Sequence, residues 1–212
     1  MNDRGKFIVF EGIDGSGKST QIKRLAKNLE ARGIKCKQTL EPTFGMVGEI
    51  LHDILSGKRV ADPKVTASLF VADRLDHILN DEDGVLKSLN EGKTVICDRY
   101  YFSSYAYQSV EVPRDWVVAA NRLAAEILRP DATIFIDISA EVAMDRISKN
   151  REETELYENL ERLARVREGY FSAFELLKAE EKIFVVDGNR SIDEIEKEIE
   201  KIVLENVYHN AI

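Results

Sequence analysis

The sequence predicts an α/β protein of three layers, in which helices flank both faces of a five-stranded parallel sheet. Three observations predict this fold. Short apolar runs alternate with longer stretches of helical periodicity, a glycine-rich loop follows the first apolar run, and no repeat or flexible linker divides the chain. With 212 residues, of which 44% are hydrophobic, the chain is long enough for a single domain over 1–212 with a sizeable core.

Five apolar runs have the composition of strands that are covered on both faces, because they are short and rich in Val, Ile and Phe. The predicted strands are Lys6–Glu11, Lys35–Leu40, Thr94–Cys97, Thr133–Asp137 and Ile183–Val186. Because helical segments separate the strands, the connections are crossovers and the sheet is mainly parallel. Ligands bind beyond the carboxyl ends of the strands in such sheets, so the residues after each strand are candidates for a site.

Six segments between and after these strands have helical periodicity. In the first of them, Ile22, Leu25 and Leu29 share one face and Gly33 acts as a stop signal. The second begins with Pro63, a residue that suits the first turn of a helix. The predicted helices are Ser19–Arg32, Pro63–Asn80, Asp115–Leu128, Ala140–Lys149, Glu155–Ala179 and Ser191–Asn206.

Charge and composition exclude several classes of protein. A net charge of −8 argues against a general DNA or RNA binder, which needs a basic surface. The apolar run at 7–10 is too short for a signal peptide, and no run of 18 apolar residues could cross a membrane. Cys36 and Cys97 lie in strand-like runs, where we expect buried, reduced thiols. We therefore expect a cytoplasmic protein with no nucleic-acid or membrane partner.

A phosphate-binding loop follows the first predicted strand. The stretch 12–19 matches G-x-x-x-x-G-K-[ST] between a strand and a helix, which is the context this motif requires; the alternative is a glycine-rich turn without a ligand. Glycines let backbone N–H groups converge on phosphate oxygens, and the helix amino terminus adds partial positive charge. Lys18 can reach the β- and γ-phosphates, and the Ser19 hydroxyl can ligate Mg²⁺. The predicted ATP-binding residues here are Gly12, Ile13, Asp14, Gly15, Ser16, Gly17, Lys18, Ser19 and Thr20.

Asp14 is unusual inside this loop, because a carboxylate opposes phosphate binding. It should therefore face a donor, such as a sugar hydroxyl or a metal-bound water. The alternative is an aspartate that only forms the turn. The spacing favours neither interpretation.

An acid–base pair, Asp98-Arg99, follows the third predicted strand, where a second substrate would lie. Arg99 could clamp a phosphate through its planar guanidinium group. Asp98 could bind the metal through water or orient a nucleophile. The alternative is a surface ion pair, which contributes little to stability.

These motifs together resemble the thymidylate kinase family. The resemblance also includes Glu41-Pro42, the run Leu69-Phe70-Val71-Ala72-Asp73-Arg74 and the run Ser103-Ser104-Tyr105-Ala106-Tyr107-Gln108, and it extends from Gly5 to about Glu205. It implies a P-loop nucleoside monophosphate kinase fold with a short lid at approximately 145–156. The implied reaction is ATP + dTMP → ADP + dTDP, for dTTP synthesis, with ATP and Mg²⁺ as cofactors.

The resemblance also implies how the base and phosphate of dTMP are bound. Phe70 matches the aromatic residue that stacks on thymine. Arg74 matches the arginine that hydrogen-bonds the base and approaches the acceptor phosphate. Arg99 matches the acceptor-phosphate arginine, while Ser104 and Gln108 match polar positions that read the thymine edge. Without the resemblance, Phe70 would be interpreted as core with Arg74 extended over it, and 100–107 as core or a turn.

The sugar contacts are implied in the same way. Asp14 matches the acid that meets the 3′-hydroxyl, which favours a function over a turn, and Tyr107 is the candidate for excluding a ribose. Glu41 is assigned to the substrate site, although related proteins often carry an arginine before Glu-Pro where this chain has Leu40.

A basic stretch at 145–151 would form the lid. A charge run is usually a solvated helix face, but phosphoryl transfer needs cations around the transferred group. Some thymidylate kinases carry an arginine in the phosphate loop at the position of Gly15, so this chain resembles the type with a catalytic lid arginine. Arg151 is the first candidate and Lys149 the second, and Arg146 could stack on the adenine.

The predicted catalytic residues are Lys18, Arg99, Arg151, Asp14 and Asp98. Mg²⁺ would arrive with ATP and be held by Ser19 and, through water, by Asp98. The histidines lack the spacing of metal ligands. The alternatives are a kinase for another nucleoside monophosphate and a P-loop ATPase that acts as a switch. The resemblance implies a homodimer through helix faces, for which Pro63–Asn80 is a candidate.

Overall fold

The computed structural model describes residues 4–147 and 153–209, and it describes side chains throughout except at 153–159. Its sheet has the strand order β2-β3-β1-β4-β5, and every neighbouring pair is parallel. The strands are β1 (Phe7–Glu11), β2 (Cys36–Leu40), β3 (Thr94–Asp98), β4 (Ala132–Asp137) and β5 (Ile183–Asp187). The predicted five-stranded parallel sheet is therefore confirmed.

Helices connect the strands and form the outer layers. They are α1 (Lys18–Ala31), α2 (Met46–Leu55), α3 (Pro63–Leu79), α4 (Val85–Asn90), α5 (Tyr101–Tyr107), α6 (Arg114–Ile127), α7 (Ala140–Ile147), α8 (Glu153–Leu177) and α9 (Ile192–Asn206), with a short 3₁₀ turn at Gln108–Val110. None of the described helices is long and apolar enough to cross a lipid bilayer.

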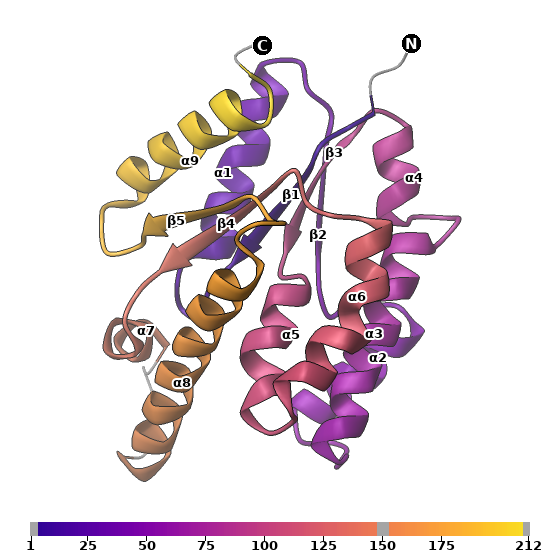
Figure 1. Ribbon diagram of the computed structural model, residues 1–212. Coiled ribbons are helices and arrows are strands. Elements are labelled where there is room, and N and C mark those ends of the chain that lie inside the picture. Colours follow the sequence, from indigo (N-terminus) through magenta and orange to yellow (C-terminus); the bar gives the residue numbers. More distant parts are fainter. Residues whose placement is uncertain (1–3, 148–152, 210–212) are drawn as a thin grey trace.

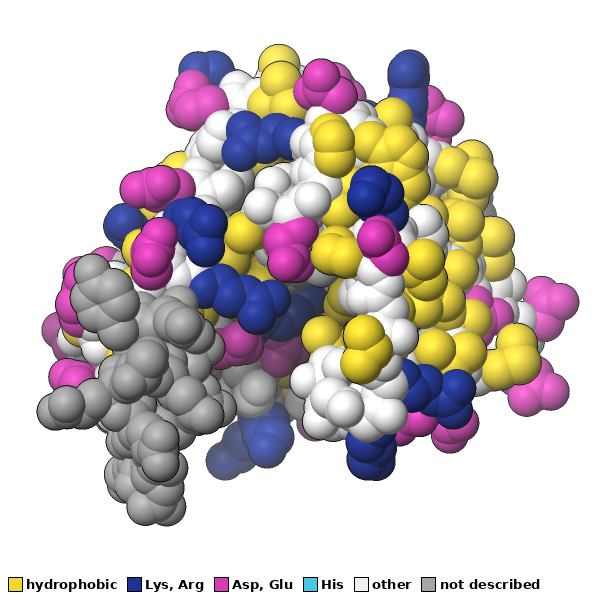
Figure 2. Space-filling view, turned by 90° about the horizontal axis from the view of Figure 1, so that it is seen from below, with side chains coloured by type: hydrophobic (Ala, Val, Ile, Leu, Met, Phe, Trp, Pro, Cys, Tyr) yellow, Lys and Arg dark blue, Asp and Glu magenta, His cyan; other side chains and the backbone are white. Residues whose placement is uncertain are grey.

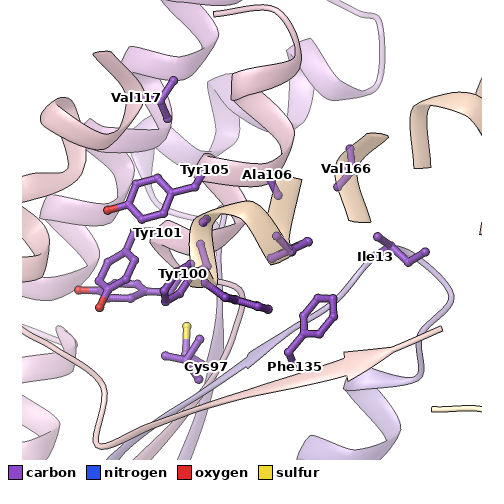
Figure 3. Close-up of a cluster of buried hydrophobic side chains, with 14 of the residues drawn as sticks. Ile13, Cys97, Tyr100, Tyr101, Tyr105, Ala106, Val117, Phe135 and Val166 are labelled. Atoms are coloured by element: carbon purple, nitrogen blue, oxygen red, sulfur yellow. The ribbon is translucent and has the colours of Figure 1, made fainter. Parts of the chain in front are cut away.

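The two faces of the sheet carry different cores. Helices α1 and α9 cover one face, and α3, α5, α6 and α8 lie on the other (Figure 1). The α1/α9 side is mainly aliphatic, with Ile22, Leu25 and Ile199 packed on the strands. The other side is rich in aromatic residues, including Tyr100, Tyr105 and Phe135 (Figure 3). Tyrosines place hydroxyl groups inside this second core, where they can bond to buried charges.

The predicted helix starts follow from local chemistry. Asp62 accepts a hydrogen bond from the Lys64 backbone N–H at 2.8 Å, directly before Pro63. Ser191 and Glu194 form a reciprocal capping box at the start of α9. Both arrangements satisfy backbone donors that have no partner within the helix.

Two predictions about the strands are wrong in part. β2 and β5 lie at the two edges of the sheet and are not covered on both faces, since each contains two exposed residues and Val186 alone among their residues is buried. Cys36 is consequently half-buried, whereas Cys97 on β3 is buried as predicted, and both are free thiols.

Three helices were not predicted. α4 has only six residues, and α2 contains Gly48, so neither has a strong helical signal. α5 is rich in aromatic residues, and no side-chain cap begins it. Its start is instead stabilised by Glu11 of β1, whose carboxylate accepts hydrogen bonds from the N–H groups of Tyr100 and Ser103. Tertiary structure therefore determines this helix.

The parallel arrangement brings the carboxyl ends of the strands to one edge of the sheet. This edge faces downward in Figure 1, and the view from below shows a hollow with basic and acidic side chains at its walls (Figure 2). The phosphate loop after β1 and Asp98-Arg99 at the end of β3 meet here, because β1 and β3 are neighbours with Phe10 opposite Asp98.

Candidate active site

The phosphate loop depends on glycines at two positions where the backbone is crowded. Gly12 has φ of 148°, and an added Cβ would lie 2.7 Å from Ser16 Oγ and 2.8 Å from the Ile136 carbonyl oxygen. Gly15 has φ of 80°, and its Cβ would lie 2.9 Å from the Ala143 carbonyl oxygen of α7. The packing of α7 on the loop therefore leaves no room for a side chain at this position.

Lys18 is held inside the loop by the loop itself. Its side chain is nearly buried, and Nζ donates to the carbonyl oxygens of Gly12 at 2.9 Å and Ile13 at 3.2 Å. Burial, together with the Arg99 cation, lowers the pKa of Lys18 to about 8. Phosphate oxygens would offer the ammonium group stronger acceptors than these neutral carbonyl groups.

Ser19 and Asp98 meet at the mouth of the loop. The Ser19 hydroxyl donates to Asp98 Oδ2 at 3.2 Å, while Asp98 Oδ1 is buried and has no hydrogen-bond partner among the described residues. A hydroxyl beside a carboxylate with one unpaired oxygen is a donor set suited to Mg²⁺ or its bound water. Both residues line the donor cradle, a cavity of about 480 Å³ that also exposes Lys18, Thr20 and Arg146.

Arg99 lies at the junction between this cradle and a second pocket. Its backbone has φ of 73°, in the left-handed region that is strained for an arginine. Its guanidinium group donates to Asp14 at 2.7 Å, and to the hydroxyls of Ser103 at 3.1 Å and Tyr107 and Tyr170 at 3.3 Å. Four hydrogen-bond partners thus fix Arg99 between the two cavities.

Glu11 accepts hydrogen bonds from two hydroxyl groups that also contact Arg99. The sequence analysis did not identify this residue. It is completely buried at the end of β1, and its Oε2 accepts the hydroxyls of Ser103 at 2.6 Å and Tyr170 at 2.8 Å. Burial raises the pKa of Glu11, while the Ser103 bond, the Arg99 charge and the Tyr170 bond oppose the shift. The two hydroxyls link the carboxylate to Arg99, so Glu11 is a positioning residue for that side chain.

Arg74 is buried in a polar network rather than exposed to solvent. Its Nε and Nη2 each lie 2.8 Å from Glu41 Oε2, and Nη1 donates to Ser104 Oγ at 3.1 Å and to the Asn121 side-chain oxygen. His77 Nδ1 lies 3.0 Å from the other Glu41 oxygen. The carboxylate therefore neutralises Arg74 and fixes its plane.

The second cavity, which we call the acceptor pocket, has a volume of about 190 Å³. It brings together seven of the predicted substrate residues, and Ser104 alone is absent from its lining because it lies beneath Arg74. The lining residues are Asp14, Glu41, Pro42, Leu55, Phe70, Arg74, Arg99, Ser103, Tyr107, Gln108 and Arg162. An aromatic wall, two positioned arginines and an amide side chain can together bind a flat base attached to a phosphate.

A third hollow of about 280 Å³ continues from the loop on the side away from the acceptor pocket. Arg146 of α7 lies at its edge and donates to the carbonyl oxygens of Gly15 at 3.3 Å and Gly188 at 3.0 Å. Its planar group is therefore held beside the phosphate loop, where a base could stack on it. The side chain of Ile13 packs into the core, so only its backbone can face a ligand. Lys149 and Arg151 lie outside the described residues.

Sequence reasoning missed Arg162 and Tyr170 as well as Glu11. No motif marks Arg162 or Tyr170. The packing of α8 on α5 brings Arg162 into the lining of the pocket and the Tyr170 hydroxyl to Arg99. One signal was available for Glu11: a carboxylate at the end of a buried apolar strand must be paired or bonded to be tolerated.

A phosphate loop that faces a second, arginine-lined pocket across the edge of a parallel sheet defines a P-loop kinase of the nucleoside monophosphate type. The comparisons with known proteins agree. A family model described as thymidylate kinase matches residues 10–199. The chain is 38% identical to a probable thymidylate kinase of Methanococcus aeolicus, over 94% of this chain and 96% of the relative. It is 37% identical to a thymidylate kinase of Clostridium novyi, over 93% and 97% respectively. The chain belongs to the thymidylate kinase family.

Proposed function

We propose that the protein transfers the γ-phosphoryl group of ATP to dTMP, producing ADP and dTDP for dTTP synthesis. The observation that carries the proposal is the position of Arg99, which lines both the donor cradle and the acceptor pocket. An anion in each cavity would meet the other beside this guanidinium group. Such an arrangement serves transfer between two phosphates, because charge develops on the group between them.

The donor cradle would hold the ATP phosphates. Backbone N–H groups of the loop and the start of α1 would bind the phosphate oxygens, and Lys18 would move from its carbonyl partners to the β- and γ-phosphates. Ser19 and Asp98 would hold Mg²⁺, which offsets phosphate charge when it is bound. Arg146 would contact the adenine side of the nucleotide.

The acceptor pocket would hold dTMP. Phe70 would stack on the thymine ring, and Arg74 and Gln108 would bond its polar edge. Ser104 would act through Arg74, because its hydroxyl oxygen accepts a hydrogen bond from Arg74 Nη1. Tyr107 and Asp14 would face the sugar, and Arg99 the phosphate.

In the proposed reaction, an oxygen of the dTMP phosphate attacks the γ-phosphorus in line, and the bond from that phosphorus to the β–γ bridging oxygen breaks. No general base is needed, because the attacking phosphate is already an anion. Asp14 bonds Arg99 at 2.7 Å and would keep it oriented while the sugar hydroxyl approaches the same carboxylate.

We also propose that the protein has a lid and forms a homodimer. We place Arg151, with Lys149 as the second candidate, on the transferred group in a lid at approximately 145–156 of a single domain over 1–212. The side of the molecule that carries α3 and α6 exposes large apolar side chains, among them Val65, Trp116 and Leu123, which supports self-association there (Figure 2). Sedimentation analysis of the purified protein tests this proposal, and a monomer at micromolar concentration would contradict it.

An assay of ADP release tests the activity. With ATP and Mg²⁺, kcat/KM should be highest for dTMP among dTMP, dUMP, dCMP, UMP, AMP and GMP. A higher value for any acceptor other than dTMP or dUMP would favour the alternative of a different nucleoside monophosphate kinase. ATP turnover that does not depend on a monophosphate would favour the P-loop switch.

A further inference from the structure

Arg162 lies on α8 at the edge of the helix face that packs against α5. Val166, Gly169 and Ala173 follow it at i+4, i+7 and i+11, and all three are buried. This stripe packs against α5, since a Cβ on Gly169 would lie 3.1 Å from Ala106 Cα. Figure 3 shows Val166 and Ala106 in the same buried cluster. Leu163 continues the buried face toward the start of α8, and the exposed Arg162 lies at its edge.

The stripe reaches the acceptor pocket at this point. α5 ends at Tyr107, and Tyr107 and Gln108 both line the pocket together with Arg162. Arg162 is exposed and lines the cavity beside the buried Leu163. No other described lining residue of the pocket comes from the segment that follows the lid.

The charges around the pocket give this arginine a distinct role. Arg74 is paired with Glu41, and Arg99 is paired with Asp14. Arg162 brings the charged residues of the described lining to three arginines and two carboxylates, so the lining has one positive charge in excess. This excess is local, because the chain as a whole has a net charge of −8. A pocket with surplus positive charge in an acidic protein favours an anionic ligand.

We propose that Arg162 is a further acceptor-binding residue, which recognises the dianionic phosphate of a nucleoside monophosphate and not its base or sugar. The inference rests on the proposed function and deepens it by identifying the charge that selects phosphorylated nucleosides over free ones. The competing interpretation is a rim arginine whose stem covers apolar surface while its head remains in water. That role would leave the affinity for the phosphate unchanged.

The chain offers a matched control for this proposal. Arg165 is exposed, lies one turn further along the same helix and is absent from the described lining of the pocket. Arg162→Ala and Arg165→Ala therefore remove the same charge from the same helix. Arg162→Lys keeps the charge and tests whether an ammonium group can replace the planar guanidinium group.

Steady-state kinetics of these variants test the proposal. Arg162→Ala should raise the KM for dTMP about tenfold, with kcat and the KM for ATP within about twofold of wild type. Arg165→Ala should match wild type, and Arg162→Lys should recover part of the loss. Inhibition by thymidine, which lacks the phosphate, should be equal in wild type and Arg162→Ala. The dTMP KM should also rise less steeply with added salt in that variant.

Three results would overturn the proposal: equal dTMP KM values for Arg162→Ala and Arg165→Ala, a loss of kcat without a change in KM, or an equal loss of thymidine affinity. If wild type does not phosphorylate dTMP, the proposed function fails separately. In that case, calorimetric titration of the same variants with dTMP decides whether Arg162 binds the phosphate.

Discussion

The donor cradle takes six of its eleven lining residues from one continuous stretch, Asp14–Thr20, whereas the acceptor pocket takes its lining from short segments spread between Asp14 and Arg162. In the proposed function, the cradle would bind anions with backbone N–H groups and one lysine. The pocket uses side chains, and two of its arginines are already paired with carboxylates. A phosphate chain common to all nucleotides can be bound by a local motif, while selection of one acceptor requires groups that only tertiary structure brings together.

The central cations of the two sites also differ in their partners. Lys18 donates only to neutral carbonyl groups, and its pKa is lowered, so the phosphates of ATP would give its ammonium group stronger acceptors. Arg74 is only 1% exposed and already has a full ionic partner in Glu41. We therefore expect substitutions in the cradle to act mainly on turnover, and substitutions beneath the acceptor pocket to act on both stability and acceptor binding.

The largest effect is expected at the cradle. Lys18→Ala should lower kcat by about 10³-fold, because the ammonium group is lost where the phosphate charge develops. The unfolding temperature should change little, since Lys18 bonds only loop carbonyls. Lys23→Ala, an exposed lysine on the same helix, is the control and should remain fully active. Near-normal turnover by Lys18→Ala would remove the basis for the cradle.

The next effect is on stability, beneath the acceptor pocket. Glu41→Gln leaves the buried charge of Arg74 without a counter-ion and should lower the free energy of unfolding by about 3 kcal/mol, with a raised KM for dTMP. Glu126→Gln breaks the exposed pair with Arg122 and should cost less than about 1 kcal/mol. Urea unfolding of both variants measures the difference. Equal losses would show that the Arg74–Glu41 pair behaves as a surface pair.

A smaller effect separates positioning from packing. Tyr170 and Tyr101 each donate a hydroxyl to a carboxylate at 2.8 Å, but only Tyr170 also contacts Arg99. Tyr170→Phe should lower kcat/KM for dTMP about tenfold without changing the KM for ATP. Tyr101→Phe should affect stability only. If both variants lose the same activity, Glu11 does not position Arg99 through Tyr170.

The smallest effect is a pH dependence. Lys18 in the free protein has a pKa of about 8, so kcat/KM for ATP should fall as the pH rises above that value and the ammonium group loses its proton. Bound phosphates favour the charged form, so the corresponding fall in kcat should occur at higher pH. Rate profiles between about pH 6 and 10 measure both limbs. Coincident limbs would mean that ATP does not contact Lys18.

The same contrast explains what the sequence could and could not predict. The sheet, the long helices and the phosphate loop depend on short-range patterns, and the structure confirms them. Helix α5 was missed because Glu11 stabilises its start from another strand. Glu11, Tyr170 and Arg162 carry no motif of their own. Phe70, Arg74 and Gln108 were identified only through family resemblance, since their residue types and spacing are equally typical of core and surface.

The central claim is that two phosphate-bearing ligands meet end to end beside Arg99, and a bisubstrate analogue tests it most directly. Calorimetry with adenosine and thymidine joined by a polyphosphate chain should give an affinity at least about 10²-fold above that of ATP or dTMP alone. Lys18→Ala and Arg99→Ala should each weaken that binding. An analogue that binds no more tightly than the better single nucleotide, or that is insensitive to Arg99→Ala, would contradict the account.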